Sequence, residues 1–149
     1  MRLSRWSRIS LIAIVFAGCT DSLQPGEIPG AYNLNDIDGR PLPTYQAATP
    51  GHPLTVNSAG LSLGFDGTAQ LIQDVTAFDG TQSTMTFNYT YRRDGRDLIF
   101  ELSPPCPIDA ICLAPPRGRV PSTHRVDLDF GTASTVPFVY HFQRITLAY

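Results

Sequence analysis

The stretch TMTFNYTYRRDGRDLIFEL, residues 84–102, decides the fold. From Met85 to Tyr91, apolar and aromatic residues occupy every second position, and polar residues occupy the positions between them. Because successive side chains of a strand point to opposite faces, this alternation predicts a strand with one apolar face. The Asp94-Gly95 pair interrupts the pattern, which resumes over residues 98–102. Such a pair between two alternating runs predicts a β-hairpin, because both central residues of a type I′ turn need positive φ.

The same combination of alternation and turn recurs along the chain. Asp66-Gly67 follows an alternating run at 61–65, Asp79-Gly80 leads into the stretch just quoted, and a further run covers 126–130. Counting residues 31–37 as the first, we expect about seven or eight strands at the spacing of an all-β domain. Sequential hairpins favour an antiparallel up-and-down meander. A meander of this size avoids exposed edges by closing, or partly closing, into a barrel.

The last apolar run, residues 136–147, changes phase part-way along. Apolar residues alternate on one face up to Phe142, whereas Ile145 and Leu147 fall on the other face. One extra residue in a strand shifts its alternation by one position, so we expect a β-bulge near Gln143.

The N-terminus has the composition of a signal peptide. Three arginines precede an apolar run at 9–17 that is too short to cross a membrane as a permanent helix. The run ends at Phe16-Ala17-Gly18-Cys19, which resembles the lipobox of bacterial lipoproteins. The resemblance implies cleavage before Cys19 and lipid on this cysteine, and two or three acyl chains anchor a protein firmly on a bilayer. In that family an aspartate after the cysteine favours the inner membrane, so Thr20 implies the outer membrane, facing the periplasm.

These features divide the chain into three parts. We expect a signal peptide at 1–18, a lipidated tether at 19–29 and one β-barrel domain at 30–149. The 131 residues left after cleavage carry eight arginines against thirteen acidic residues, a formal charge of −5. This negative charge argues against nucleic acid as a partner, and it leaves the lipid anchor as the contact with the membrane.

Residues 30–43 carry the motif G-x-Y-x-L-x-x-I-x-G-x-x-L-P. The motif resembles the opening strand of small bacterial lipoproteins with lipocalin-like or META-like β-barrels, and the resemblance implies a lipocalin-like barrel here. Lipocalins place a basic residue of the last strand over an aromatic ring of the first strand. Tyr32 and Arg144 hold these positions in this chain. The resemblance therefore implies a cation–π contact that closes the barrel, a contact worth about 0.5–2 kcal/mol.

No combination of residues predicts catalysis or metal binding. His52, His124 and His141 lack the spacing of a zinc site. Asp127 and Asp129 share one strand face at about 6.5–7 Å, which suits paired acid–base catalysis but is commoner on a solvated surface. We therefore expect no enzyme activity, no catalytic residue, no metal and no cofactor.

Aromatic side chains form the feature with the greatest potential for binding. If they line an unfilled barrel, they make an apolar pocket; if they pack together, they are the core that a domain of this length needs. The first arrangement predicts a lipocalin-like carrier of a small apolar ligand. The second leaves a non-enzymatic interaction or structural module of the cell envelope. The candidate pocket consists of Phe87, Tyr89, Tyr91, Phe100, Phe138 and Tyr140.

The segment SPPCPIDAICLAPPRG, residues 103–118, contains Cys106 and Cys112. Thiol oxidoreductases separate their cysteines by two residues, this pair is separated by five, and two sulfur ligands alone make a poor metal site. With Cys19 lipidated, an even pair on the oxidising side of a membrane predicts a disulfide, and closing a seven-residue loop contributes about 2 kcal/mol. Its prolines, its apolar residues Ile108, Ile111 and Leu113, and a basic rim of Arg117 and Arg119 make this loop a candidate site for a protein or glycan partner, with packing over the barrel mouth as the alternative.

Overall fold

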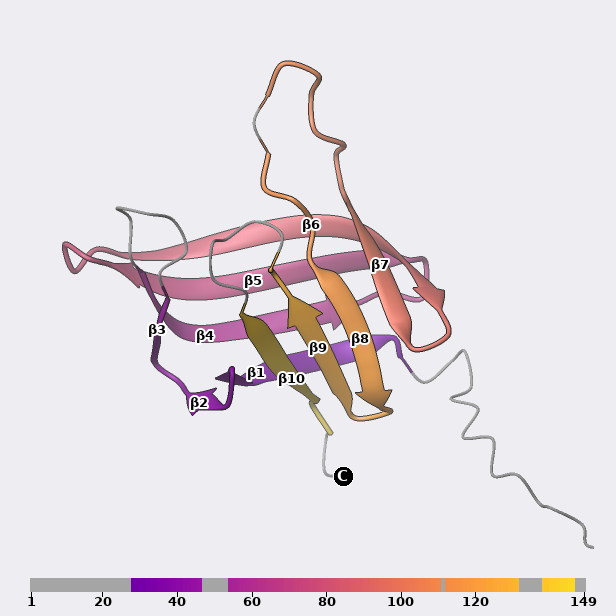
Figure 1. Ribbon diagram of the computed structural model, residues 1–149, viewed down its shortest axis with the longest axis horizontal. Coiled ribbons are helices and arrows are strands. Elements are labelled where there is room, and N and C mark those ends of the chain that lie inside the picture. Colours follow the sequence, from indigo (N-terminus) through magenta and orange to yellow (C-terminus); the bar gives the residue numbers. More distant parts are fainter. Residues whose placement is uncertain (1–27, 47–53, 111, 132–137, 147–149) are drawn as a thin grey trace, which may run out of the picture.

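The computed structural model describes residues 28–46, 54–110, 112–131 and 138–146 and shows an all-β protein (Figure 1). The described residues form ten strands and no helix. The expected signal peptide and Cys19 lie outside these residues, as does most of the tether. The strands are β1 (Gly30–Ile37), β2 (Arg40–Pro41), β3 (Thr44–Gln46), β4 (Leu54–Leu63), β5 (Thr68–Ala77), β6 (Gln82–Asp94), β7 (Asp97–Leu102), β8 (Arg117–Ser122), β9 (Arg125–Asp129) and β10 (Val139–Arg144).

Eight of the strands close into an antiparallel barrel. The order around the ring is β1-β10-β9-β8-β7-β6-β5-β4, and β4 pairs back with β1, where Tyr32 lies opposite Leu61. β2 and β3 lie outside the ring, where they pair with β1 and β4. Strands from β4 to β10 pair with their neighbours in sequence. The predicted all-β, up-and-down meander is therefore confirmed, and it is closed.

The stretch at 84–102 forms the hairpin β6–β7, as predicted, but the type of turn differs. The last paired residues leave Gly95 and Arg96 as the two turn residues. Only Gly95 has a positive φ, of 61°, which is the arrangement of a type II′ turn. The type I′ pattern occurs instead at Asp38-Gly39, between β1 and β2, where both φ angles are positive, at 52° and 74°.

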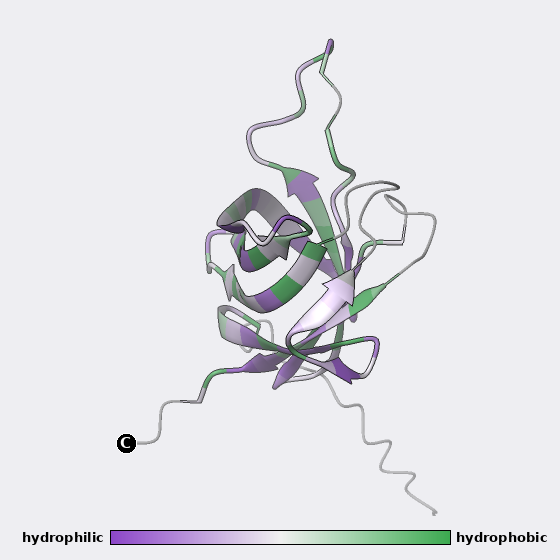
Figure 2. Cartoon of the chain, turned by 90° about the vertical axis from the view of Figure 1, so that its left-hand side faces the viewer, coloured by the Kyte–Doolittle hydropathy of each residue, from purple (hydrophilic) through white to green (hydrophobic). Residues whose placement is uncertain are grey.

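Alternation along the strands fills the barrel with apolar side chains. In β5, Ala69, Leu71 and Val75 are buried, whereas the residues between and before them include exposed polar side chains such as Gln70. Figure 2 shows this alternation as green and purple bands along the strands. Full burial of a large apolar side chain contributes about 1.5–3 kcal/mol, so this interior is the main source of stability. The largest fully buried residues are Tyr32, Ile37, Val56, Leu61, Leu71, Leu98, Val120, Val126, Leu128, Tyr140 and Phe142.

β8 lies partly within the segment that was expected to be a loop. It has one large inward-facing apolar residue, Val120, because a glycine occupies its other buried position. A Cβ atom at Gly118 would lie 2.6 Å from Cε2 of Phe100 and 2.7 Å from Cβ of Leu98. The space beside Gly118 is therefore already filled from β7, and only glycine allows the two strands to pack this closely.

The predicted bulge near Gln143 is wrong. β10 pairs with β9 without a break from its first residue to Gln143, and the irregularity lies on β1, between Leu34 and Asp36. The alternation itself does not change at the end of β10. The Ile145 amide still donates to the Ala31 carbonyl of β1 at 2.9 Å, and the Ile145 side chain, 43% exposed, is an apolar residue on the outer side of the sheet.

β6 extends beyond its neighbour β7. Residues Tyr89–Asp94 pair with β7, whereas Gln82–Asn88 pair with β5. Figure 1 shows the β5–β6 hairpin reaching past the rest of the barrel wall. Among the described residues, the first half of β6 therefore has a strand neighbour on one side only.

Candidate functional site

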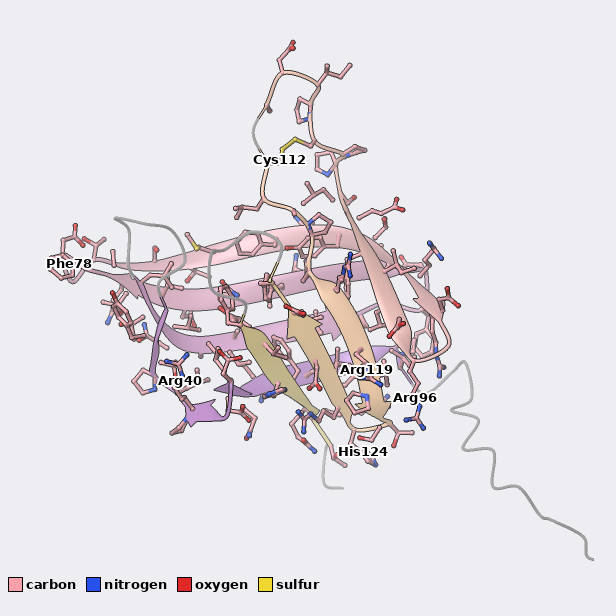
Figure 3. All side chains as sticks on the ribbon, in the orientation of Figure 1. Arg40, Phe78, Arg96, Cys112, Arg119 and His124 are labelled. Atoms are coloured by element: carbon pink, nitrogen blue, oxygen red, sulfur yellow. A yellow bond between two sulfur atoms is a disulfide. The ribbon has the colours of Figure 1, made fainter. Side chains whose placement is uncertain are left out.

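The segment between β7 and β8 forms a loop that stands clear of the barrel. In Figures 1 and 2, the connection from β7 to β8 projects from one end of the sheet, and Figure 3 shows the disulfide part-way along it. The predicted bond between Cys106 and Cys112 is present, with Cα atoms 6.0 Å apart. Ala110 N–H donates to the Pro107 carbonyl at 3.0 Å, which adds a turn inside the clipped segment.

The apolar side chains of the loop face solvent. Ile108 is fully exposed and Leu113 is 62% exposed. Ile111, the third apolar residue, lies outside the described residues. The alternative in which the loop packs over the barrel mouth is therefore wrong for Ile108 and Leu113. Two exposed apolar side chains on a disulfide-closed loop form the kind of surface that a binding partner can cover.

A groove of about 870 Å³ begins at the foot of this loop and runs over the outer face of β7, β8, β9 and β10. Pro115 and Pro116 form its end nearest the loop, and Arg117 and Arg119 of β8 line its middle. The two arginines therefore belong to a strand and to the groove, whereas they were expected to be part of the loop. Figure 3 shows Arg119 on β8, below the loop that carries Cys112.

Charges of alternating sign cross the groove in one row. The register places Asp97 of β7 opposite Arg119, Arg119 opposite Asp127 of β9, Asp127 opposite His141 of β10, and His141 opposite Asp36 of β1. Directly opposed side chains on one face of a sheet have Cβ atoms about 4.5–5.5 Å apart, and pairs of opposite charge are favourable there. The groove is therefore lined by both acidic and basic residues, with four aspartates against two arginines and one histidine.

His141 of this row lies near three charged side chains. Its Nδ1 lies 2.8 Å from Oδ1 of Asp127 and 2.7 Å from Nη2 of Arg125, and its Nε2 lies 3.8 Å from Oδ1 of Asp36. A protonated Nδ1 donates to Asp127, whereas an unprotonated Nδ1 accepts from Arg125, so the nitrogen cannot make both bonds at once. Arg125 Nε also donates to Asp127, at 2.7 Å. Which of the two hydrogen bonds His141 makes therefore depends on whether its Nδ1 carries the hydrogen.

The two acids of β9 have different partners. Asp127 accepts from Arg125 and contacts His141, whereas Asp129 accepts from the Gly131 amide at 2.7 Å. Asp129 also lies opposite Arg117 in the register. The structure thus separates the roles of two carboxylates that the sequence places on one face.

Tyr32 and Arg144 meet where the first and last strands pair. The guanidinium carbon of Arg144 lies 6.0 Å from the centre of the Tyr32 ring, and Arg144 Nη2 donates to the Pro29 carbonyl at 2.8 Å. The Tyr32 hydroxyl donates to the Ile28 carbonyl. Burial raises the pKa of this hydroxyl, and the positive charge of Arg144 offsets part of that rise. A Cβ atom at Gly30 would lie 3.1 Å from Arg144 Nη2, so the glycine of the opening motif leaves room for the guanidinium.

The six aromatic residues of the candidate pocket contact one another or the core. Tyr89 and Phe100 meet edge to face at 5.7 Å, Tyr91 and Phe100 at 6.1 Å, and Phe138 and Tyr140 at 5.8 Å between ring centres. Tyr89, Phe100 and Tyr140 are buried, and the other three, Phe87, Tyr91 and Phe138, are partly buried against the core. Tyr91 donates to the Gly64 carbonyl at 2.8 Å. Burial raises the pKa of Tyr89 to about 12.

Comparison with known proteins gives no match: no protein-family model fits the chain, and searches of curated proteins and of solved structures found none that matches it. In the described part of the chain, no helix is long and apolar enough to cross a membrane. Over the same residues, no three His, Cys, Asp or Glu side chains gather as a metal site.

Proposed function

We propose that this chain is a bacterial envelope lipoprotein, anchored through Cys19 to the outer membrane and facing the periplasm, and that it acts as a non-enzymatic interaction module. The observation that carries the proposal is the disulfide-clipped loop, which holds Ile108 and Leu113 in solvent. The partner, a protein or glycan, contacts the loop and enters the groove at its foot.

The construction of the loop supports this proposal. Binding costs free energy when a flexible segment must be ordered, and the Cys106–Cys112 bond and the prolines reduce that cost in advance. The loop also rises from a closed barrel, and recognition residues are commonly placed on loops carried by a rigid scaffold.

The groove adds a charged component to the contact. Arg119 lies between Asp97 of β7 and Asp127 of β9, and Arg117 lies opposite Asp129 of β9. Complementary charge at the rim of an interface mainly raises the association rate and sets orientation, and salt weakens its effect. Binding at this site is therefore expected to be slower at high ionic strength.

A comparison of loop variants tests the interaction. The tagged chain is purified from the envelope beside Ile108→Asp with Leu113→Asp, and the material retained by each is compared. A specific partner is retained by the wild-type chain and lost from the double variant. Phe65→Asp is the matched control, because Phe65 is 86% exposed and lies in the β4–β5 turn, outside the loop. Equal retention by all three proteins would count against the proposal.

The anchor is tested separately through Cys19. Labelled palmitate is expected to enter the wild-type chain and not Cys19→Ser. Label in both proteins, or in neither, would remove the lipoprotein part of the proposal while leaving the interaction part open to its own test.

The lipocalin-like carrier is the alternative function. It would require the rings of Tyr89, Phe100 and Tyr140 to separate from neighbours that they now contact. Their mutual packing favours the interaction module. Titration of the purified protein with a fluorescent fatty acid is expected to show no saturable uptake, and uptake of one molecule per chain would favour the carrier.

A further inference from the structure

The first half of β6 presents an open strand edge. Gln82–Asn88 pairs with β5 on one side, and none of the described residues pairs with it as a strand on the other. The Ser103 amide donates to the Asn88 carbonyl at 3.0 Å, and there the chain leaves the sheet for the disulfide loop. Backbone groups of every second residue in an antiparallel strand point to the same side. Those of Thr84 and Thr86 therefore point to the open edge.

This edge lacks the features that usually prevent a strand from pairing with another chain. The segment QSTMTFN, residues 82–88, contains no charged residue and no proline, and threonine and phenylalanine favour strands. Met85 is 40% exposed although its register partner on β5, Gln73, is buried. The chemistry of the edge thus suits another extended strand with uncharged side chains.

The edge is complementary to itself. When two copies run antiparallel about Met85, Thr84 lies opposite Thr86 of the second copy. Asn88 takes no part, because Ser103 already occupies the position beside it. On one face, hydroxyls meet hydroxyls. On the other face, Met85 meets the same residue of the second copy, with Phe87 two residues away. Cross-strand pairs of this kind are favourable in sheets.

We propose that a second copy of this chain docks on this edge, so that the two sheets join through antiparallel β6 strands. The two-fold axis passes at Met85, and both copies use the same residues, as a closed dimer requires. The backbone groups of Thr84 and Thr86 exchange hydrogen bonds across the axis. The interface uses neither the disulfide loop nor the groove, so it is independent of the proposed function.

A cysteine at the axis tests this arrangement directly. Met85 points its backbone groups toward β5, so the pair at the axis is a non-hydrogen-bonded pair, with Cα atoms about 4.5 Å apart. That spacing lies within the range of disulfides. Met85→Cys in the full chain is therefore expected to form a covalent dimer under mild oxidation, seen on a non-reducing gel. The matched control is Ile72→Cys, because Ile72 is also 40% exposed but lies within β5. The wild-type chain gives the background from its own cysteines.

Charge at the edge supplies the second test. Thr84→Lys with Thr86→Lys places like charges opposite each other and is expected to abolish the cross-link of Met85→Cys. Thr90→Lys, in the part of β6 that pairs with β7, is expected to leave it unchanged. Three results would overturn the proposal: no more dimer from Met85→Cys than from Ile72→Cys, a dimer that survives the lysines, or cross-linking to a different protein alone.

Discussion

Gly118 lies under the Phe100 ring, where a Cβ atom would come within 2.6 Å of Cε2. Gly118→Ala must therefore push β7 and β8 apart, and we expect the free energy of unfolding to fall by about 1–3 kcal/mol. Urea unfolding of the purified protein measures the change. Gly60→Ala is the control, because its Cβ would meet only the Tyr32 carbonyl oxygen, at 3.9 Å, and should cost no more than about 0.5 kcal/mol. Equal stability of the two variants would contradict this account of the packing.

Tyr32 and Arg144 join the first and last strands of the ring. In a double-mutant cycle of Tyr32→Leu and Arg144→Gln, we expect a coupling free energy of about 0.5–2 kcal/mol. Tyr32→Phe keeps the ring and removes only the bond to the Ile28 carbonyl, so it should retain the coupling to Arg144. Additive effects of the first two changes would show that the ring and the guanidinium do not interact.

Single residues account for where sequence patterns succeed and where they fail. The contact between Tyr32 and Arg144 was expected because these two positions match a family pattern, although nothing in the sequence itself shows that the two residues are close. Gly118 has the opposite effect: it removes one apolar position from Arg117–Ser122, so the alternation that reveals other strands is missing. The residue that fills the space, Phe100, lies on a different strand and is visible only in the fold.

At the scale of elements, the disulfide loop is expected to matter more for recognition than for stability. A disulfide that closes a seven-residue loop contributes about 2 kcal/mol to stability if the folded loop keeps its conformation when the bond is absent. This loop makes few contacts with the barrel, as the exposure of Ile108 and Leu113 shows. Cys106→Ser with Cys112→Ser should therefore free the loop in the folded protein too, and cost less than about 1 kcal/mol of unfolding free energy.

Limited proteolysis checks this prediction alongside urea unfolding. The double serine variant should be cut within 103–116 faster than the wild-type chain, while the barrel unfolds at nearly the same urea concentration. A large loss of barrel stability, or unchanged cleavage, would show that the loop is held by contacts other than its clip.

Strands were predictable where apolar and polar residues alternate along a continuous stretch of sequence. β6 and β7 follow from residues 84–102, and the hairpin between them was expected at the correct place. The turn type was not, because pairing continues through Asp94 and shifts the two turn residues by one. Turn type depends on the cross-strand register, which local sequence does not determine.

At the scale of the whole molecule, buried tyrosines make stability sensitive to high pH. Burial raises the pKa of Tyr89 to about 12 and raises the pKa values of Tyr32 and Tyr91. The unfolded chain loses these protons near pH 10, before the folded protein does, so the tyrosine contribution to stability should be constant below about pH 10 and fall between about pH 10 and 12. Each such group contributes up to about 1.4 kcal/mol per pH unit in that window.

Tyr89→Phe isolates the largest of these contributions. Urea unfolding from pH 9 to pH 12 should show a shallower loss of stability in the variant, because one proton fewer is released on unfolding. An unchanged slope would mean that the Tyr89 hydroxyl is not shielded from water as the structure indicates.

The charged groove illustrates what only the whole molecule reveals. Asp36, Asp97, Arg119, Asp127 and His141 come from five strands, and no two of them are close enough in sequence to form a motif. Closure of the ring brings β1 beside β10 and so completes the row. The barrel could be predicted because the alternation of apolar and polar residues is a local feature of the sequence. The row of charged residues could not be predicted, because it depends on the register between strands that are distant in sequence.

The central claim is that the chain recognises a partner through its disulfide-clipped loop, and site-specific photo-crosslinking in living cells tests it most directly. A photoreactive amino acid is placed at Ile108 in one protein and at Phe65, also exposed, in another. The account predicts one discrete adduct with a different envelope component from position 108, and none from position 65. Adducts that are equal at the two positions, or absent from both, would contradict it.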